Sequence, residues 1–187
     1  MGITANDKEK HILSLSAAGD HRAMDELYHE YAPYLAGVCY RYVLDETRME
    51  DVLQDSFVKI FTGIGGFTYR GEGSLKAWMT RIVVNESLQE LSRRSADPEV
   101  TGELPDLEMS EEEPDITGIS IDEIISLTAR LPEGYRAVFN MFVFDGMSHR
   151  EIAGTLGISE STSASQLFKA KKMMAALVRN YQSQKQG

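Results

Sequence analysis

The sequence predicts an all-α protein in which two small helical domains are joined by an acidic, flexible linker. Apolar residues recur at helical spacing in nearly every patterned stretch, and no run alternates convincingly with the period of two that a half-buried strand shows. Between Ser95 and Ile119 the pattern stops, in a segment with three prolines, two glycines and many carboxylates. Such a segment cannot bury enough apolar surface to offset the entropy of ordering it.

The charge of the chain follows the same division. The formal net charge is −10, yet residues 96–123 hold eleven acidic and no basic side chains. Residues 1–95 carry a net charge of −3, and residues 124–187 carry a net charge of +4. Modules joined by an acidic connector produce this kind of asymmetry.

Domain boundaries follow from these two patterns. We expect an N-terminal helical domain at 1–95, the linker at 96–119, a C-terminal helix-turn-helix domain at 120–180 and a disordered tail at 181–187. The sequence shows neither a signal-peptide pattern nor a long apolar run, and its single cysteine fits a reducing compartment. We therefore expect a cytoplasmic protein that does not insert into membranes.

Five helices are predicted before the linker, each from a local start or stop signal. Gly19 ends the first helix, which covers roughly Lys8–Ala18, and Asp20 caps the second. Pro33 lies in the first turn of the third. A Thr47/Glu50 capping box opens the fourth, which runs to about Phe61, and Ser74 caps the fifth, which runs to about Ser92.

Four helices are predicted after the linker. A Ser120/Glu123 capping box opens the first, and Pro132 begins the second. The last two helices begin within Ser148–Lys172 and are separated by a tight turn. A protein uses this shape to lay a helix in the DNA major groove, and an ordinary helical hairpin is the alternative.

The signals around this turn are local and specific. Ser148 with Glu151 forms a capping box, and Ile152 lies on the apolar face of the helix that follows. Gly157 closes that helix, since only glycine takes a left-handed C-terminal position without strain. Ser159 then caps the last helix, whose apolar residues recur at helical spacing, namely Leu167, Ala170, Met174, Leu177 and Val178.

The helix after Thr47 carries a polar stripe opposite its apolar face. Asp51, Gln54 and Asp55 point one way, and Leu53, Phe57 and Ile60 point the other. The stripe is interpreted either as an ordinary solvated face or as a docking surface for a basic partner.

The segment after that helix combines five glycines with Phe67, Tyr69 and Arg70. Aromatic and guanidinium faces stack on unpaired bases, and glycines let a backbone approach a ligand. The alternative is a flexible loop whose aromatic side chains fold back onto the core.

Together these features resemble a bacterial RNA polymerase sigma factor of the extracytoplasmic-function (ECF) group. The run DVLQDSF (Asp51–Phe57) is similar to the family signature that binds the coiled coil of the polymerase beta-prime subunit. GSLKAWMTRIVVN (Gly73–Asn85) resembles the helix that, with the preceding loop, melts and captures the minus-ten promoter element. Leu131–Ser159 is similar to the module that binds the minus-thirty-five element.

The resemblance implies three sets of binding residues. They are Asp51, Gln54 and Asp55 for the polymerase; Phe67, Tyr69, Arg70, Ser74, Lys76, Trp78, Arg81 and Asn85 for minus-ten DNA; and Arg150, Ser161, Thr162, Ser165, Gln166 and Lys169 for minus-thirty-five DNA. It also implies three partners: core RNA polymerase, through its beta-prime clamp and beta flap, promoter DNA, and an anti-sigma factor.

Departures from the family pattern concern promoter choice. Ala164 and Gln166 stand where Lys or Arg is often found, and Gln89 stands where an Asp is frequent. A stand-alone helix-turn-helix regulator and a sigma-like decoy for an anti-sigma protein are the alternative functions. We predict no catalytic residues, cofactor or metal site, because the four histidines form no ligand-spaced pair and Cys39 has no evident base partner.

Overall fold

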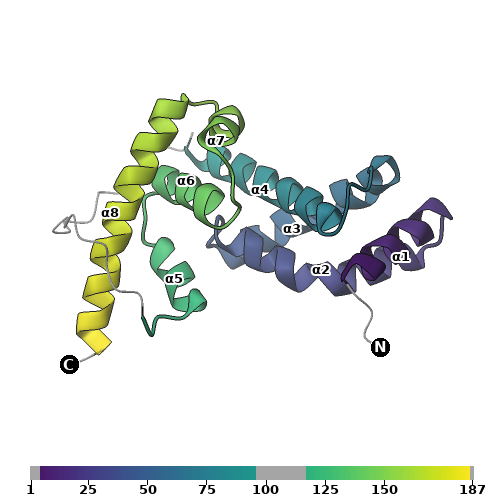
Figure 1. Ribbon diagram of the computed structural model, residues 1–187, viewed down its shortest axis with the longest axis horizontal. Coiled ribbons are helices and arrows are strands. Elements are labelled where there is room, and N and C mark those ends of the chain that lie inside the picture. The colour runs from purple at the N-terminus through teal and green to yellow at the C-terminus, as the bar shows by residue number, and fades with distance from the viewer. Residues whose placement is uncertain (1–4, 96–116, 186–187) are drawn as a thin grey trace. The chain divides into compact units, whose positions relative to one another are not determined.

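The computed structural model describes residues 5–95 and 117–185, and all regular secondary structure in these ranges is helical (Figure 1). The helices are α1 (Ala5–Ala17), α2 (Arg22–Tyr40), α3 (Glu46–Gly63), the 3-10 turn η1 (Ile64–Gly66), α4 (Ser74–Ser95), α5 (Ile121–Thr128), α6 (Glu133–Val143), α7 (His149–Leu156) and α8 (Glu160–Lys185). The prediction of an all-α fold is confirmed. The linker predicted at 96–119 lies almost wholly outside the described residues.

The chain separates into two compact units, one ending at Glu90 and the other beginning at Leu91. In the first unit, α1 and α3 both pack against α2. Ala23, Leu27 and Tyr31 of α2 are buried there. Burial raises the pKa of Tyr31 to about 12, and the nearby Glu9 carboxylate adds to this shift.

Pro33 does not begin a helix, contrary to the prediction, because α2 runs through it without a break. A proline inside a helix lacks the N–H that would bond the carbonyl four residues back, here that of His29, and costs about 3 kcal/mol. Tyr31 and Leu35 are buried on either side of Pro33, and their burial favours one continuous helix. The local start signal is thus overridden by packing.

The start of α3 also differs from the prediction. Asp45 is its N-cap, and the Asp45 carboxylate accepts a hydrogen bond from the Arg48 N–H at 3.0 Å. The Thr47/Glu50 capping box is therefore wrong, because the helix has already begun at Glu46. Asp is as good an N-cap as Thr, and here it stands two residues earlier in the chain.

Ser74 does not cap α4 as predicted. Its hydroxyl instead accepts a hydrogen bond from the Arg70 N–H of the preceding loop, at 3.2 Å. The first N–H groups of α4 find a partner far away in the sequence. The Glu9 carboxylate, from α1, accepts from the Gly73 and Lys76 N–H groups at 3.1 and 3.3 Å.

In the second unit, α8 packs against α5, α6 and α7 (Figure 1). The capping boxes at Ser120 and Ser148 are both present, and Pro132 precedes the first residue of α6, as predicted. The predicted apolar face of α8 is buried: Leu167, Ala170, Met174, Leu177 and Val178.

The helix α8 extends further than predicted. Residues 181–185, expected to be disordered, continue the helix to Lys185. The Tyr181 hydroxyl donates a hydrogen bond to the Glu123 carboxylate, and Lys185 Nζ lies 2.9 Å from the same carboxylate. These contacts lower the pKa of Glu123 to about 2, with the Tyr181 hydrogen bond as the largest cause. A polar composition therefore did not mean disorder here.

Candidate functional sites

The outer face of α3 carries the acidic stripe at which docking was predicted. Asp51, Gln54 and Asp55 are all exposed there. The two cations of α3 are engaged elsewhere, with carboxylates of α4. Lys59 Nζ lies 2.5 Å from Glu86, and Arg48 Nη1 lies 3.4 Å from Glu90. The outer face of α3 is therefore acidic without compensating cations of its own.

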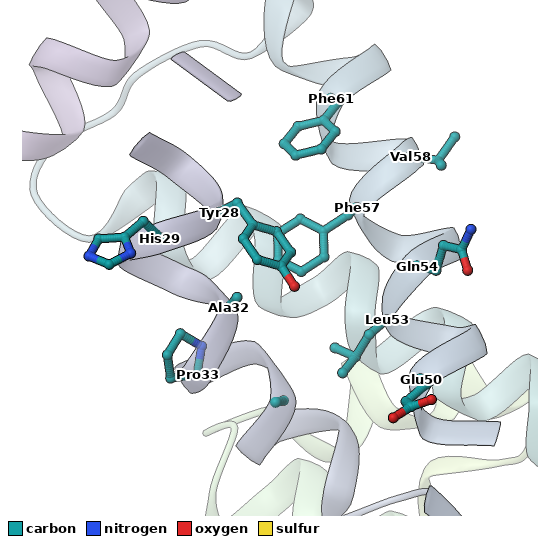
Figure 2. Close-up of a pocket in the computed structure, with 11 residues that line it drawn as sticks. Tyr28, His29, Ala32, Pro33, Glu50, Leu53, Gln54, Phe57, Val58 and Phe61 are labelled. Carbon is teal, nitrogen blue, oxygen red and sulfur yellow. The ribbon is translucent and has the colours of Figure 1, made fainter. Parts of the chain in front are cut away.

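An apolar groove runs between α2 and α3, next to the stripe (Figure 2). The rings of Tyr28 and Phe57 meet in its centre, with centroids 4.8 Å apart, and Phe61 lies beside Phe57. Glu50 and Gln54 lie along its border. Tyr28 and Val58 remain more than half exposed, at 54% and 56%. The face is thus an exposed apolar strip edged by acid and amide groups.

This groove was missed by the sequence reasoning. The α3 side of it was visible as the apolar face of a helix, but helical periodicity does not show which part of such a face stays exposed. Leu53 is in fact only half-buried, while Val52 and Ser56 are buried. The α2 side, including Ala32 and Pro33, was hidden by the false helix boundary at Pro33.

A second pocket lies where the glycine-rich loop returns to α4. It brings together five of the eight predicted minus-ten residues, namely Phe67, Arg70, Ser74, Trp78 and Arg81. The Phe67 and Trp78 rings pack with centroids 5.2 Å apart. Two guanidinium groups and two aromatic rings therefore share one pocket, which suits stacking on bases and contact with phosphates.

The other three predicted minus-ten residues lie outside this pocket. The Tyr69 hydroxyl donates a hydrogen bond to the side-chain oxygen of Asn6 in α1. Lys76 Nζ lies 3.8 Å from the centre of the Tyr34 ring, which fixes it against α2. Asn85 is exposed on α4, more than a full helical turn beyond Arg81 in residue order.

In the second unit, α7 and α8 form the helix-turn-helix. Gly157 has φ +66° and ψ 29°, the left-handed conformation expected of it. The Ile158 N–H bonds the Ala153 carbonyl at 3.1 Å, which completes a Schellman turn. The Ser159 hydroxyl then accepts from the Thr162 N–H at 3.0 Å and so caps α8, as predicted.

The start of α8 presents most of the predicted minus-thirty-five residues to solvent. Ser161, Thr162, Ser165 and Lys169 are exposed, and so is Arg150 on α7. The hydroxyls of Ser161 and Thr162 each lie 2.8 Å from that of Ser159, so they belong to the cap network.

Two side chains of early α8 depart from the expected face of exposed polar residues. Gln166 is half-buried, and its amide lies close to Gly134 of α6. Phe168 is 61% exposed, with Lys172 Nζ 4.8 Å from its ring centre. Sequence reasoning missed Phe168, although a bulky apolar residue among polar outward positions was a visible signal. An exposed ring here can contact a thymine methyl group.

Two features are absent from the described residues: a metal-ligating cluster and a membrane-spanning helix. No cluster of three or more metal-ligating side chains occurs among them. In the same ranges, no helix is both long and apolar enough to span a bilayer. Cys39 is a buried free thiol, and burial raises its pKa.

Comparison with known proteins identifies both units. The family model for sigma-70 region 2 matches residues 27–96, and the model for sigma-70 region 4 matches residues 121–174. These are the two regions of a promoter-recognition protein, in order. The chain belongs to the RNA polymerase sigma factors of the ECF type.

Individual relatives agree over most of their length. The chain is 28% identical to the RNA polymerase sigma-H factor of Pseudomonas aeruginosa, covering 91% of this chain and 93% of that protein. It is 28% identical to the ECF sigma-E factor of Haemophilus influenzae, covering 83% and 87%. A solved structure of CnrH in complex with the cytosolic domain of CnrY has the same fold, with a TM-score of 0.53 and 24% identity over 93% of this chain and 99% of that chain.

Proposed function

We propose that this sigma factor directs core RNA polymerase to promoters through three surfaces, each on a different part of the chain. The stripe and groove of α3 bind the polymerase clamp, the Phe67–Trp78 pocket captures minus-ten bases, and α7–α8 binds the minus-thirty-five element. The main support for the assignment is that pocket, where two guanidinium groups lie beside two aromatic rings in tilted contact.

Docking on the clamp follows from charge and shape. Asp51 and Asp55 are exposed on a helix whose two cations, Arg48 and Lys59, are paired with carboxylates of α4. The groove beside them offers an apolar strip around Tyr28 and Phe57. A helix that presents basic residues flanking an apolar ridge complements both features, because rim charges steer and orient while the apolar centre supplies affinity.

Capture of melted bases follows from the pocket. Extruding a base costs pairing and stacking energy, and stacking on an aromatic ring returns about 1–3 kcal/mol for each base. Phe67 is only half-buried and so presents ring surface to a base. Trp78 lies beneath it and supports the ring, while Arg70 and Arg81 supply cations for the backbone.

The charge distribution explains why recognition needs the polymerase. Phosphate contacts supply most non-specific DNA affinity. Residues 124–187 carry only +4, next to the eleven carboxylates of residues 96–123. We expect this chain to bind duplex weakly when free, and to recognise promoters once the polymerase holds it in register.

Several further assignments belong to this proposal. The functional domains are 1–95 and 120–180, the protein acts in the cytoplasm, and it performs no catalysis itself. The solved CnrH structure contains the cytosolic domain of CnrY. By analogy, an anti-sigma partner that covers the same exposed surfaces fits this chain. A stand-alone regulator is not favoured, because it leaves the region 2 match unexplained.

The docking test compares two double variants at the same two positions. Asp51→Arg with Asp55→Arg reverses the charge of the stripe, whereas Asp51→Asn with Asp55→Asn removes charge at nearly constant shape. We expect co-purification with core polymerase to be lost in the Arg pair and weakened in the Asn pair, with unchanged circular dichroism. Full core binding by the Arg pair would refute the docking surface.

The promoter test uses the reconstituted holoenzyme in run-off transcription. Changing Gln166 and Lys169 to Ala is expected to weaken initiation on a duplex promoter that depends on its minus-thirty-five element. Initiation on a template already melted around minus ten is expected to survive. Equal loss on both templates would contradict the assignment of α8.

A further inference from the structure

The helix α1 lies outside the residues that match the region 2 family model, yet it makes specific contacts with the minus-ten loop. The match begins at residue 27, whereas α1 covers Ala5–Ala17. Within the first unit, α1 packs on α2 and on the turn η1 at the base of the loop. Two of its polar side chains, Asn6 and Glu9, reach the loop itself.

Glu9 is the central contact. It is a carboxylate with only 2% of its surface exposed, which is costly unless hydrogen bonds compensate the lost water. Its two oxygens accept from two backbone N–H groups, those of Gly73 at 3.1 Å and Lys76 at 3.3 Å. These groups lie at the N-terminus of α4, where a negative charge is also favoured by the helix dipole.

Asn6 holds the loop at a second point. Its side-chain oxygen accepts a hydrogen bond from the Tyr69 hydroxyl. Lys10 Nζ, also on α1, lies 5.8 Å from the centre of the Tyr69 ring. One face of α1 therefore contacts the loop at two points on either side of Arg70: at Tyr69, and at Gly73 directly before α4.

The loop needs such support because its own sequence does not fix it. Gly71 and Gly73 adopt φ values of +122° and +80°, and glycine has wide backbone freedom because it lacks a Cβ. Local hydrogen bonds restrain only the end of the loop: the Arg70 N–H donates to the Ser74 hydroxyl at 3.2 Å, and the Ser74 N–H donates to the Gly71 carbonyl at 3.1 Å. An external brace reduces the entropy that base capture must otherwise remove.

We propose that α1 is a brace for minus-ten capture, with Glu9 as the positioning residue that holds the loop and the start of α4 in the form that accepts flipped bases. The inference rests on the proposed function of the Phe67–Trp78 pocket. It assigns Glu9 no contact with DNA. Its effect reaches the DNA through the loop backbone.

The test exploits Trp78, the only tryptophan of the chain, which packs against Phe67 of the loop. We compare wild type, Glu9→Ala, Glu9→Gln and Asn6→Ala as full chains. The matched control is Lys8→Ala on the same helix, because Lys8 pairs with Glu30 of α2 at 2.7 Å and does not touch the loop.

Three readouts are measured for each variant. Acrylamide quenching of Trp78 emission in the free protein reports how well the loop covers the indole. Affinity for core polymerase reports docking. With the holoenzyme, affinity for a forked template with a single-stranded minus-ten element reports base capture.

We expect Glu9→Ala to increase quenching and to weaken forked-template binding roughly ten- to hundredfold, the loss typical of a hydrogen bond to a charged group. Core affinity stays at the wild-type level. In both quenching and forked-template affinity, Glu9→Gln is expected to lie between the wild type and Glu9→Ala, since it keeps an acceptor oxygen without the charge. The Lys8→Ala control behaves as wild type in all three readouts.

Wild-type quenching and template binding by Glu9→Ala would overturn the brace, as would an equal loss of core affinity in every α1 variant, Lys8→Ala included. Should Glu9→Ala lose its helical circular dichroism, Asn6→Ala decides: weakened capture with normal core affinity supports the brace, and normal capture overturns it. Failure of the wild type to bind core would instead overturn the proposed function, while quenching still tests whether α1 orders the loop.

Discussion

The turn of the helix-turn-helix gives a prediction in which one substitution has opposite effects at two neighbouring sites. Gly157 has φ +66°, whereas Gly154 lies within α7. A Cβ added at either position meets no atom within 4 Å. Any effect of alanine there is therefore conformational and not steric.

The expected sizes follow from that difference. At Gly157, alanine must adopt the left-handed conformation, which costs about 1–2 kcal/mol. At Gly154, alanine suits the helix and reduces the freedom of the unfolded chain, so it stabilises by about 0.4–1 kcal/mol. The two variants should therefore differ by about 2 kcal/mol, or roughly thirtyfold in the local opening equilibrium.

Hydrogen exchange of the α7 and early α8 amides measures this directly. Protection is expected to fall in Gly157→Ala, to rise in Gly154→Ala, and to fall only partly in Gly157→Asn, because Asn tolerates the left-handed region. Minus-thirty-five binding by the holoenzyme should follow the same order. Equal protection in the two alanine variants would refute the reasoning.

Three further outcomes are expected. Asp45→Ala should destabilise the first unit by about 1 kcal/mol in urea unfolding followed by tryptophan emission, while Thr47→Ala, at the wrongly predicted cap, changes it little; the reverse order would restore Thr47 as the cap. Stability contributed by Glu123 is present above pH 4.5 and lost as the pH falls to about 2, and Tyr181→Phe should raise the pKa of Glu123 in an NMR titration. An unchanged titration would exclude the Tyr181 hydrogen bond as the cause. Gly63→Ala brings a Cβ to 3.1 Å from the indole, so the tryptophan emission should shift.

The sequence predicted the C-terminal unit better than the N-terminal one for a physical reason. Its boundaries are set by local groups, such as the Ser148/Glu151 capping box and Gly157, whose partners lie within a few residues. In the N-terminal unit the deciding partners are distant. Glu9 replaces the predicted cap of α4 from more than sixty residues away in the sequence, and no local sequence pattern predicts this contact.

The candidate sites show the same division. Residues with a helical register, such as Asp51 and Asp55, are exposed as predicted. The pocket at Phe67 depends on how a glycine-rich loop folds back, which periodicity does not describe. Phe168 was not singled out from the sequence, and its exposure is consistent with the apolar share of the surface of any folded protein.

The thiol of Cys39 has a consequence for how signals reach this protein. It has no exposed surface, and this burial raises its pKa although Ser87 donates a hydrogen bond to the sulfur at 3.5 Å, which favours the thiolate. Peroxides and electrophiles attack accessible thiolates, so Cys39 should react with them only slowly. Oxidative stress, if it governs these promoters, must be sensed by a different molecule and relayed here by binding. For the experimenter, any cysteine introduced on the surface becomes the one site that a maleimide dye labels.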